Sequence, residues 1–242
     1  CLDCQYCNEG KEYLCENIEV TDESLKGGYS EYITVSEDFA TKVPDTMTSD
    51  YAAPLFCAGI TAYKAVKAVE PHKNKKIAIF GIGGVGHMAI QFSKVEGCEV
   101  SGVSRKEKHL QVAKKLGADN VFVYSSDQEK FLNDVKENYG LFDGAIVFAP
   151  VDEVTDTAIK SVKKGGTVVI ATVGKIPNFL AFEEKTIRGT LIGSRKDMEH
   201  VIEISGKNNF EVVTETFPLE NANEALQKLK TSDIEARAVL IP

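Results

Sequence analysis

The sequence lacks the features of several large classes of protein. No apolar run approaches the roughly 20 residues that a membrane-spanning helix needs, and no signal-peptide pattern opens the chain. Positive charge is not in excess, because the 242 residues carry a net charge of -8. These absences argue against a membrane protein and against a surface for nucleic acid or anionic lipid. We therefore expect an ordinary globular protein, and the cysteine usage described below indicates the reducing cytoplasm as its compartment.

Internal repeats and low-complexity linkers are also missing. Strand and helix patterns alternate between about residues 58 and 193, which predicts a doubly wound α/β fold with a parallel sheet and right-handed crossovers. Expected strands are 77–80, 98–103, 121–124, 144–148 and 167–171, with helices ending near 94 and 116. Alternating residues at 28–35 predict a half-buried strand. The last fifty residues predict helices near 196–206 and 220–231 and strands near 211–217 and 236–241.

A glycine-rich segment, Gly81-Ile82-Gly83-Gly84-Val85-Gly86, follows the apolar strand that ends at Phe80. This G-x-G-x-x-G spacing between a strand and a helix is typical of dinucleotide-binding domains. The first glycine makes a tight turn, the second lets the backbone approach a pyrophosphate, and the third permits close helix packing. The helix N-terminus also attracts phosphates. We predict cofactor contacts from Gly81, Gly83, Gly84, Val85 and Gly86; a glycine turn without a ligand is the alternative.

No carboxylate stands at the end of the second strand, where an NAD-binding domain has one for the adenosine ribose. The chain has Ser104, Arg105 and Lys106 there instead. A guanidinium pairs well with a 2′-phosphate, and a hydroxyl can hydrogen-bond to it. We therefore favour NADP(H) over NAD(H). Solvated cations at a helix start are the alternative interpretation.

Four of the six cysteines crowd into the first fifteen residues: Cys1, Cys4, Cys7 and Cys15. Disulfides between residues three apart strain easily, and tight cysteine clusters in a chain without a secretion signal usually bind metal. Four thiolates at this spacing favour a tetrahedral zinc with no open position, which is a structural site. An iron–sulfur cluster is an alternative, although its common spacings differ. Cys98 stands alone and is expected to pack in the second strand.

The four-cysteine spacing, the glycine loop and the segments between and after them together resemble the zinc-containing medium-chain alcohol dehydrogenases. The likeness is greatest to the branch with cinnamyl-alcohol-type and microbial NADP-dependent members. Residues 53–63 resemble the stretch before the family's cofactor domain, and residues 27–32 resemble the strand that follows the structural lobe. Arg237 resembles the late arginine that reaches the cofactor phosphates. The resemblance covers essentially the whole chain.

Carried over residue by residue, the resemblance implies that Cys57 is a ligand of a catalytic zinc and that Thr61 lies beside the nicotinamide. Val173 and Ser194 match positions whose backbone groups hold the carboxamide. We expect His87 on a helix face near the phosphates. The family takes a further cysteine and histidine ligand from a segment before the structural lobe, and none of the four histidines here sits in a matching motif.

A catalytic zinc normally needs three protein ligands. We therefore expect this chain to lack the start of the catalytic domain and to have little or no turnover alone. The expected domains are residues 58–193, the Rossmann domain, and residues 1–57 with 194–242, a partial, mostly β GroES-like catalytic domain with a structural zinc lobe at 1–15.

The resemblance implies reversible oxidation of alcohols to aldehydes or ketones, with zinc as Lewis acid and NADP(H) or NAD(H) as hydride carrier. It also implies a homodimer or homotetramer built through the edge of the cofactor sheet, for which residues 190–193 are the candidate. Two alternatives stay open. One is a non-catalytic dinucleotide-binding or redox-sensing module; the other is a zinc-independent quinone reductase of the same superfamily, which usually lacks the cysteine lobe.

Overall fold

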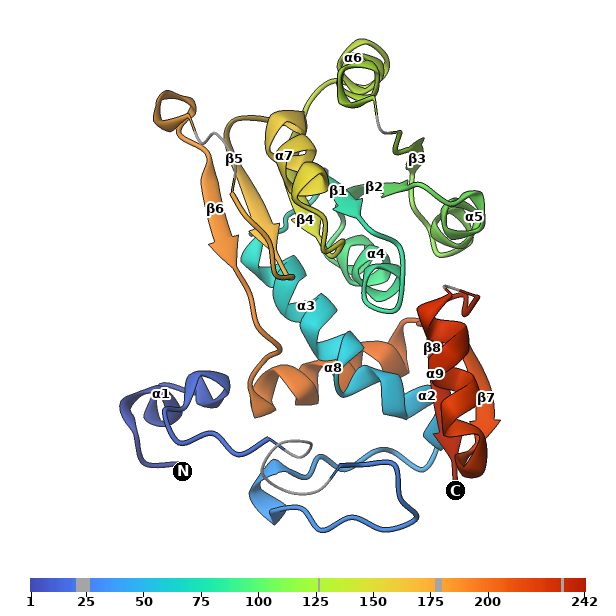
Figure 1. Cartoon of the computed structure of the whole chain (residues 1–242). Helices are drawn as coiled ribbons and strands as arrows, with labels where there is room; N and C mark the ends of the chain where they lie inside the picture. Colours follow the sequence, from blue (N-terminus) through green and yellow to red (C-terminus); the bar gives the residue numbers. More distant parts are fainter. Residues whose placement is uncertain (21–26, 126, 177–179, 232) are drawn as a thin grey trace. The chain divides into compact units, whose positions relative to one another are not determined.

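The computed structural model describes residues 1–20, 27–125, 127–176, 180–231 and 233–242 (Figure 1). The chain divides into two compact units: unit 1 comprises Cys1–Ile60 and Ile192–Pro242, and unit 2 comprises Thr61–Leu191. Each unit has buried apolar residues of its own. Within the described residues, every helix is too short or too polar to traverse a lipid bilayer.

Unit 2 is built on a sheet in the order β3-β2-β1-β4-β5-β6, and every strand pair in it is parallel (Figure 1). The strands are β1 (Lys76–Phe80), β2 (Glu99–Ser104), β3 (Asn120–Val123), β4 (Phe142–Val147), β5 (Val162–Ile170) and β6 (Thr186–Gly189). The order grows from β1 in one direction to β3 and then in the other direction to β6, which is the doubly wound arrangement. The predicted α/β fold with a parallel sheet is confirmed.

Four helices cross between these strands, and a short 3-10 turn precedes β6. They are α4 (Gly86–Val95), α5 (Glu107–Lys115), α6 (Gln128–Asn138) and α7 (Asp152–Ser161), with η4 (Ala181–Glu183) as the turn. Helix α4 contacts α5, and α6 contacts α7. Right-handed crossovers put these two pairs on opposite faces, because the strand order reverses between β1 and β4. Helix α5 ends where the sequence predicts, since Gly117 adopts a φ of +96° that closes a helix end.

Buried apolar side chains join the sheet of unit 2 to α6 and α7. In β1, Ile77, Ala78, Ile79 and Phe80 are all 0% exposed, as the short apolar run in the sequence predicts for a central strand. Phe131 of α6 lies edge-on to Phe80 with ring centroids 6.1 Å apart. Edge-to-face pairs of this kind add about 0.5–1.5 kcal/mol to the effect of burial alone.

Unit 1 combines short helical turns with two longer helices and one parallel strand pair, β7–β8. Its elements are α1 (Gln5–Asn8), η1 (Glu12–Leu14), η2 (Glu37–Phe39), α2 (Ser49–Ala52), η3 (Ala53–Leu55), α8 (Arg195–Lys207), β7 (Thr214–Pro218), η5 (Leu219–Asn221), α9 (Ala222–Lys230) and β8 (Arg237–Ile241), and α3 (Ala58–Ala68) begins here and continues into unit 2. Phe217, Ala225 and Ile234 form a small core under the strand pair. The helices and strands predicted after residue 194 are confirmed.

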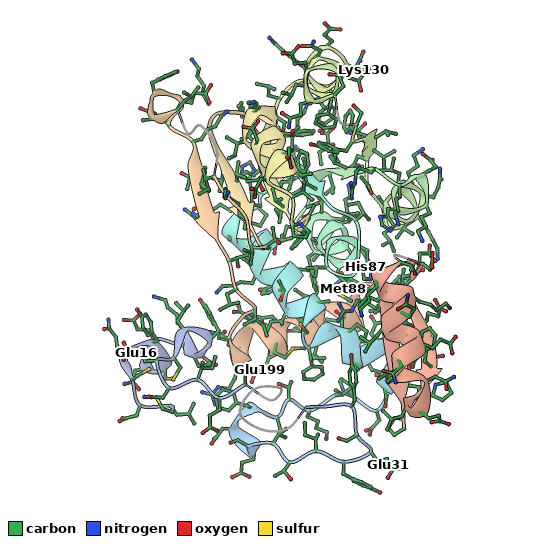
Figure 2. All side chains as sticks on the ribbon, viewed as in Figure 1. Glu16, Glu31, His87, Met88, Lys130 and Glu199 are labelled. Atoms are coloured by element: carbon green, nitrogen blue, oxygen red, sulfur yellow. The ribbon has the colours of Figure 1, made fainter. Side chains whose placement is uncertain are left out.

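The strand predicted at 28–35 is wrong, because none of these residues forms a strand. Alternation predicts a strand only if one side of it is buried against a partner. Here Tyr29, Tyr32 and Val35 are all exposed. Neither the odd-numbered nor the even-numbered residues therefore form a buried face. The side chain of Glu31 also points away from its segment (Figure 2).

Two further expectations need correction. In the described part of unit 1 the strands are β7 and β8, so strands are fewer there than a mostly β lobe implies. Residues 190–193 do not form an edge of the cofactor sheet. They follow β6, which is itself one edge strand, and β3 is the other.

Candidate metal and cofactor sites

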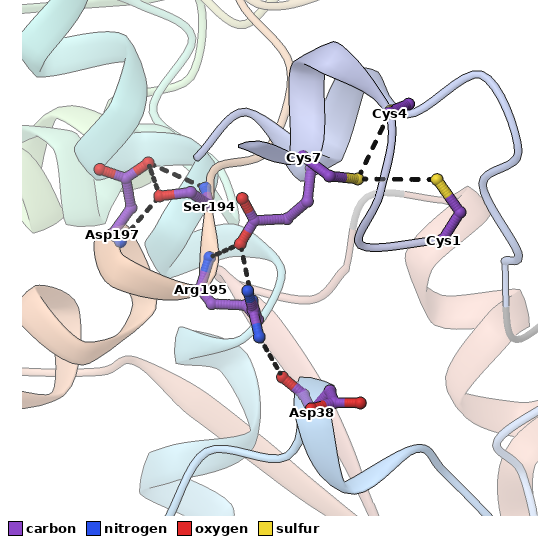
Figure 3. Close-up of polar contacts among 8 residues, drawn as sticks. Cys1, Cys4, Cys7, Asp38, Ser194, Arg195 and Asp197 are labelled. Carbon is purple, nitrogen blue, oxygen red and sulfur yellow. Dashed lines mark hydrogen bonds and ion pairs between the residues drawn. The ribbon is translucent and has the colours of Figure 1, made fainter. Parts of the chain in front are cut away.

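The four cysteines of the cysteine lobe (residues 1–15) meet in one small volume. Their sulfur atoms all lie within 4.8 Å of one another. The Sγ–Sγ distance is 3.4 Å between Cys15 and Cys1. It is 3.6 Å between Cys4 and Cys7 and 4.0 Å between Cys1 and Cys7 (Figure 3). All four thiols are free, and these distances far exceed a disulfide of about 2.05 Å.

This sulfur spacing fits a tetrahedral zinc. With Zn–S bonds of about 2.3 Å, tetrahedral geometry separates the sulfurs by about 3.8 Å, close to the distances observed. The hydrogen bond from the Cys7 backbone N–H lowers the pKa of the Cys4 thiol, and this favours the thiolate that a metal binds. The donor set and its geometry therefore fit a closed, structural zinc site, although the role of the four cysteines as ligands stays a prediction.

Local backbone features bring the cysteines together. Cys4 is the N-cap of α1, which carries Cys7, and Gly10 turns the chain back with a φ of +70°. Cys15 then caps the turn η1, and its N–H donates to the carbonyl oxygen of Glu12 at 3.1 Å. One short helix and the turns beside it thus supply all four sulfurs.

The cysteine lobe is attached to α8 through Glu12. The carboxylate Oε1 of Glu12 accepts the backbone N–H of Arg195 at 2.8 Å and the Nε–H of its guanidinium at 3.0 Å. Burial alone would raise the pKa of Glu12, but these hydrogen bonds hold the pKa below its usual value. Arg195 also donates from Nη1 to the carbonyl oxygen of Asp38 at 3.1 Å (Figure 3) and lies over the ring of Phe39. The contact between Glu12 and Arg195 leaves no local signal in the sequence, because 183 residues separate the two.

In the loop between β1 and α4, each of three glycines is suited to its position for a different physical reason. Gly81 has a φ of +96°, which L side chains rarely adopt. A Cβ on Gly86 would lie 2.0 Å from the carbonyl oxygen of Gly81, so any side chain there collides with backbone. A Cβ on Gly83 would meet nothing within 4 Å, which leaves its backbone open to an approaching group. These are the conformations expected of a pyrophosphate-binding turn.

Helix α4 starts directly after this loop with His87 and Met88 in its first turn (Figure 2). His87 is fully buried, and its Nδ1 lies 3.0 Å from the carbonyl oxygen of Gly83. His87 thus lies on the buried face of α4 beside the glycine loop, and its place near the phosphates stays a prediction.

The end of β2 carries the hydroxyl and cations expected beside an adenosine ribose. Ser104 is buried, and its Oγ accepts the backbone N–H of Lys106 at 3.3 Å and lies 3.3 Å from Nδ1 of His109. Arg105 and Lys106 are exposed. The carboxylate of the nearby Glu107 accepts a hydrogen bond from Gln111, which lies one turn further along α5.

Burial lowers the pKa of His109, and the neighbouring Lys106 and Lys108 lower it further. The imidazole therefore stays neutral at neutral pH. The cationic character of this strand end comes from Arg105 and the lysines.

Parallel pairing brings the glycine loop and the Ser104 strand end together. Phe80 pairs with Val103, and the N–H of Gly81 donates to the carbonyl oxygen of Val103 at 3.0 Å. Val173 follows β5 in the same unit and is 91% exposed. The carboxyl ends of parallel strands near a reversal of strand order are the usual dinucleotide site.

The remaining predicted residues are distributed over both units. Thr61 belongs to unit 2, whereas Cys57, Ser194 and Arg237 belong to unit 1. Ser194 is the N-cap of α8, where its hydroxyl and N–H both bond to Asp197 in a capping box. Cys57 is exposed, and the described residues form no group of three or more metal-ligating side chains around it. Cys98 is buried next to β2, as expected for packing.

Comparisons with known proteins agree with this geometry. A protein-family model described as zinc-binding dehydrogenase matches residues 84–207. An alcohol dehydrogenase of Geobacillus stearothermophilus is 34% identical over 245 residues, covering 99% of this chain and 72% of that protein. Cinnamyl alcohol dehydrogenase 7 of Arabidopsis thaliana is 31% identical over 254 residues, covering 99% and 70%. The structure of acetophenone reductase from Geotrichum candidum NBRC 4597 in complex with NAD has a TM-score of 0.87 at 29% identity, covering 100% of this chain and 71% of that one.

Proposed function

Because this chain belongs to the zinc-binding dehydrogenase family, we propose that it is the part of an alcohol dehydrogenase that binds the nicotinamide cofactor and a structural zinc. The reaction of the whole enzyme is then the interconversion of a small alcohol with its aldehyde or ketone by hydride transfer. The related proteins named above include two alcohol dehydrogenases. The chain's assembly as a homodimer or homotetramer and its cytoplasmic location belong to the same proposal and rest on the family resemblance.

The observation that carries this proposal is the glycine loop at the carboxyl end of β1. Gly83 leaves its backbone open, while Gly81 and Gly86 hold a turn that no larger side chain fits. This combination at the start of a helix serves the approach of a pyrophosphate. The four-sulfur lobe separates the proposal from a zinc-independent reductase, because its geometry fits a metal that such enzymes do not need.

In this proposal the chain's residues bind and orient the cofactor. The first N–H groups of α4 and the loop Gly81–Gly86 hold the pyrophosphate, with Arg237 as a further phosphate contact. Ser104, Arg105 and Lys106 hold the adenosine end and favour a 2′-phosphate, because two cations are available and no carboxylate competes. Thr61, Val173 and Ser194 orient the nicotinamide. The bound nicotinamide supplies the hydride chemistry.

The residues do not fit a catalytic zinc in this chain. Cys57 offers a single thiolate, and in the part of the chain that the structure describes no group of three or more possible ligands includes it. A catalytic zinc normally takes three protein ligands. We therefore expect cofactor binding without appreciable alcohol oxidation by these 242 residues.

Fluorescence titration of NADPH and NADH, with zinc measured by elemental analysis, tests the proposal. We expect one zinc per chain and tighter binding of NADPH than of NADH. Loss of charge-assisted hydrogen bonds costs about 1.5–3 kcal/mol, so Arg105→Ala should weaken NADPH binding by about 10- to 100-fold. NADH binding should change little. A Lys108→Ala variant, which removes a cation in the first turn of α5 and outside the predicted set, is the matched control.

Three results would contradict separate parts of the proposal. A folded chain that binds neither cofactor overturns the dehydrogenase assignment. Tighter binding of NADH than of NADPH overturns the preference assigned to Ser104 and Arg105. Alcohol oxidation at a rate typical of dehydrogenases overturns the assignment of an incomplete catalytic site.

A further inference from the structure

The Glu12–Arg195 ion pair joins the cysteine lobe to the N-terminus of α8 within unit 1. The side chain of Glu12 is only 7% exposed, and it accepts two hydrogen bonds from Arg195. A buried carboxylate is stable only while its partners stay in place. The position of η1, which carries Glu12 and is capped by Cys15, is therefore tied to Arg195.

The same contact completes the start of α8. The first N–H groups of a helix have no partner within the helix. Here Glu12 accepts the N–H of Arg195, Ser194 Oγ accepts the N–H of Asp197 at 3.1 Å, and Asp197 accepts the N–H of Ser194 at 2.8 Å (Figure 3). A carboxylate is also favoured at the positive end of the helix. The cysteine lobe thus supplies one of the groups that order this helix end.

Glu12 consequently forms hydrogen bonds both to a cysteine of the lobe and to the start of α8. Its backbone carbonyl holds the N–H of Cys15 at 3.1 Å, and its side chain holds Arg195. Arg195 is further fixed by the carbonyl oxygen of Asp38 and the ring of Phe39, so it cannot follow Glu12 without breaking other contacts. A shift of Cys15 is therefore transmitted to the first turn of α8.

We infer that Glu12 and Arg195 are positioning residues that couple zinc binding by the cysteine lobe to the order of the α8 N-terminus, where Ser194 stands. The inference rests on the proposed structural zinc. Coupling between two sites is reciprocal: zinc binding orders the start of α8, and an intact Arg195 strengthens zinc binding. Residues that hold metal ligands in place typically account for about 10- to 100-fold in metal affinity.

Competition with a chromophoric zinc chelator tests this coupling on the full chain. Glu12→Gln and Arg195→Met should each weaken zinc binding by about 10- to 100-fold. The double variant should bind zinc as tightly as the weaker-binding of the two single variants, because both substitutions remove the same contact. Arg195→Lys, which keeps the charge, should recover part of the affinity. The matched control is Glu203→Gln, which breaks the exposed Glu203–Lys207 pair on the same helix and should leave zinc affinity unchanged.

Hydrogen exchange of the amides at 195–198 supplies a second readout. Removal of zinc should speed their exchange in the wild-type chain, whereas Glu12→Gln should make their exchange insensitive to zinc. Thermal melting of unit 2, which has a buried core of its own, reports that each variant is folded.

The outcomes separate this inference from the proposed function. If the wild-type chain binds one zinc and the Glu12 and Arg195 variants bind it equally well, the coupling is wrong and the zinc site stands. If zinc removal leaves exchange at 195–198 unchanged, the coupling is also wrong. If the wild-type chain binds no zinc at all, the proposed zinc site fails, and the coupling fails with it.

Discussion

In β1 of unit 2, the residues from Ile77 to Phe80 are fully buried, whereas in the cysteine lobe only Glu12 and Cys15 of the fifteen residues are buried. Full burial of an Ile or Phe side chain contributes about 1.5–3 kcal/mol. Unit 2 therefore obtains its order from its own apolar side chains. The cysteine lobe has almost none to bury.

This difference indicates what has to replace a hydrophobic core in the lobe. Four sulfurs lie at the spacing of a tetrahedral metal site, and an ion pair between the buried Glu12 carboxylate and the partly exposed Arg195 attaches the lobe to α8. Structural zinc contributes on the order of 10 kcal/mol to small domains of this kind. The lobe should therefore depend on zinc and on Arg195, while the sheet should not depend on either.

The largest expected effect is the loss of the lobe on zinc removal. Chelation, or Cys4→Ser, should take the zinc content from one per chain to near zero and remove about 10 kcal/mol of local stabilisation. Limited proteolysis should then cut within residues 1–15. The melting temperature of unit 2 should stay within a few degrees, because its core is separate.

Cys57→Ser is the matched control, because it removes an exposed cysteine outside the lobe. Its zinc content should stay at one. A lobe that resists proteolysis equally well without zinc would contradict the contrast between the two regions.

A second test compares two glycines of the same loop in unit 2. Gly86→Ala drives its Cβ into the carbonyl oxygen of Gly81 and should destabilise unit 2 by about 1–3 kcal/mol or more, because backbone cannot move aside easily. Gly83→Ala meets nothing within 4 Å and should leave the melting temperature unchanged. It should still weaken NADPH binding by about tenfold, or about 1.4 kcal/mol, because its methyl group covers the open backbone.

Thermal melting of the two variants measures the predicted loss of stability, and NADPH titration measures the predicted loss of cofactor affinity. The two glycines would lose their separate roles if both variants melted alike, or if Gly83→Ala bound NADPH as well as the wild-type chain does.

The same contrast explains which parts of the structure could be predicted from the sequence. The strands and helices of unit 2 were predictable because each buried element carries its own apolar pattern and is closed by local signals such as Gly117. The four-cysteine cluster was predictable because its spacing is local too. Each of these signals lies within about fifteen residues.

Features that depend on distant partners were not predictable. The alternation at 28–35 is typical of a strand, yet the described residues supply no neighbouring strand for it. Both its odd-numbered and its even-numbered side chains are exposed. The contact of Glu12 with Arg195 joins residues 183 positions apart, so no local pattern reports it. Only the Ser194–Asp197 capping-box spacing at the start of α8 was a readable signal there.

The smallest expected effect concerns an ion pair that supports unit 2 beside its core. Asp119 accepts hydrogen bonds from Lys94 Nζ at 2.7 Å and from the backbone N–H of Val100 at 2.7 Å. Burial opposes ionisation of Asp119, but these bonds outweigh it and lower the pKa. A depressed pKa means that the stabilisation is present above the unfolded-state pKa of about 4 and is lost as the pH falls through the folded-state value.

Asp119→Asn keeps an acceptor for Val100 and removes the charge, so it should cost about 1 kcal/mol or less at pH 7, since the pair is partly exposed to solvent. Urea unfolding at several pH values measures this cost. The difference between variant and wild type should be constant above about pH 5 and shrink below pH 4. Lys94→Met should give a similar cost at pH 7, and the double variant should not add to it. A difference that persists undiminished at pH 3 would mean that the cost of the substitution does not come from the lost charge of Asp119.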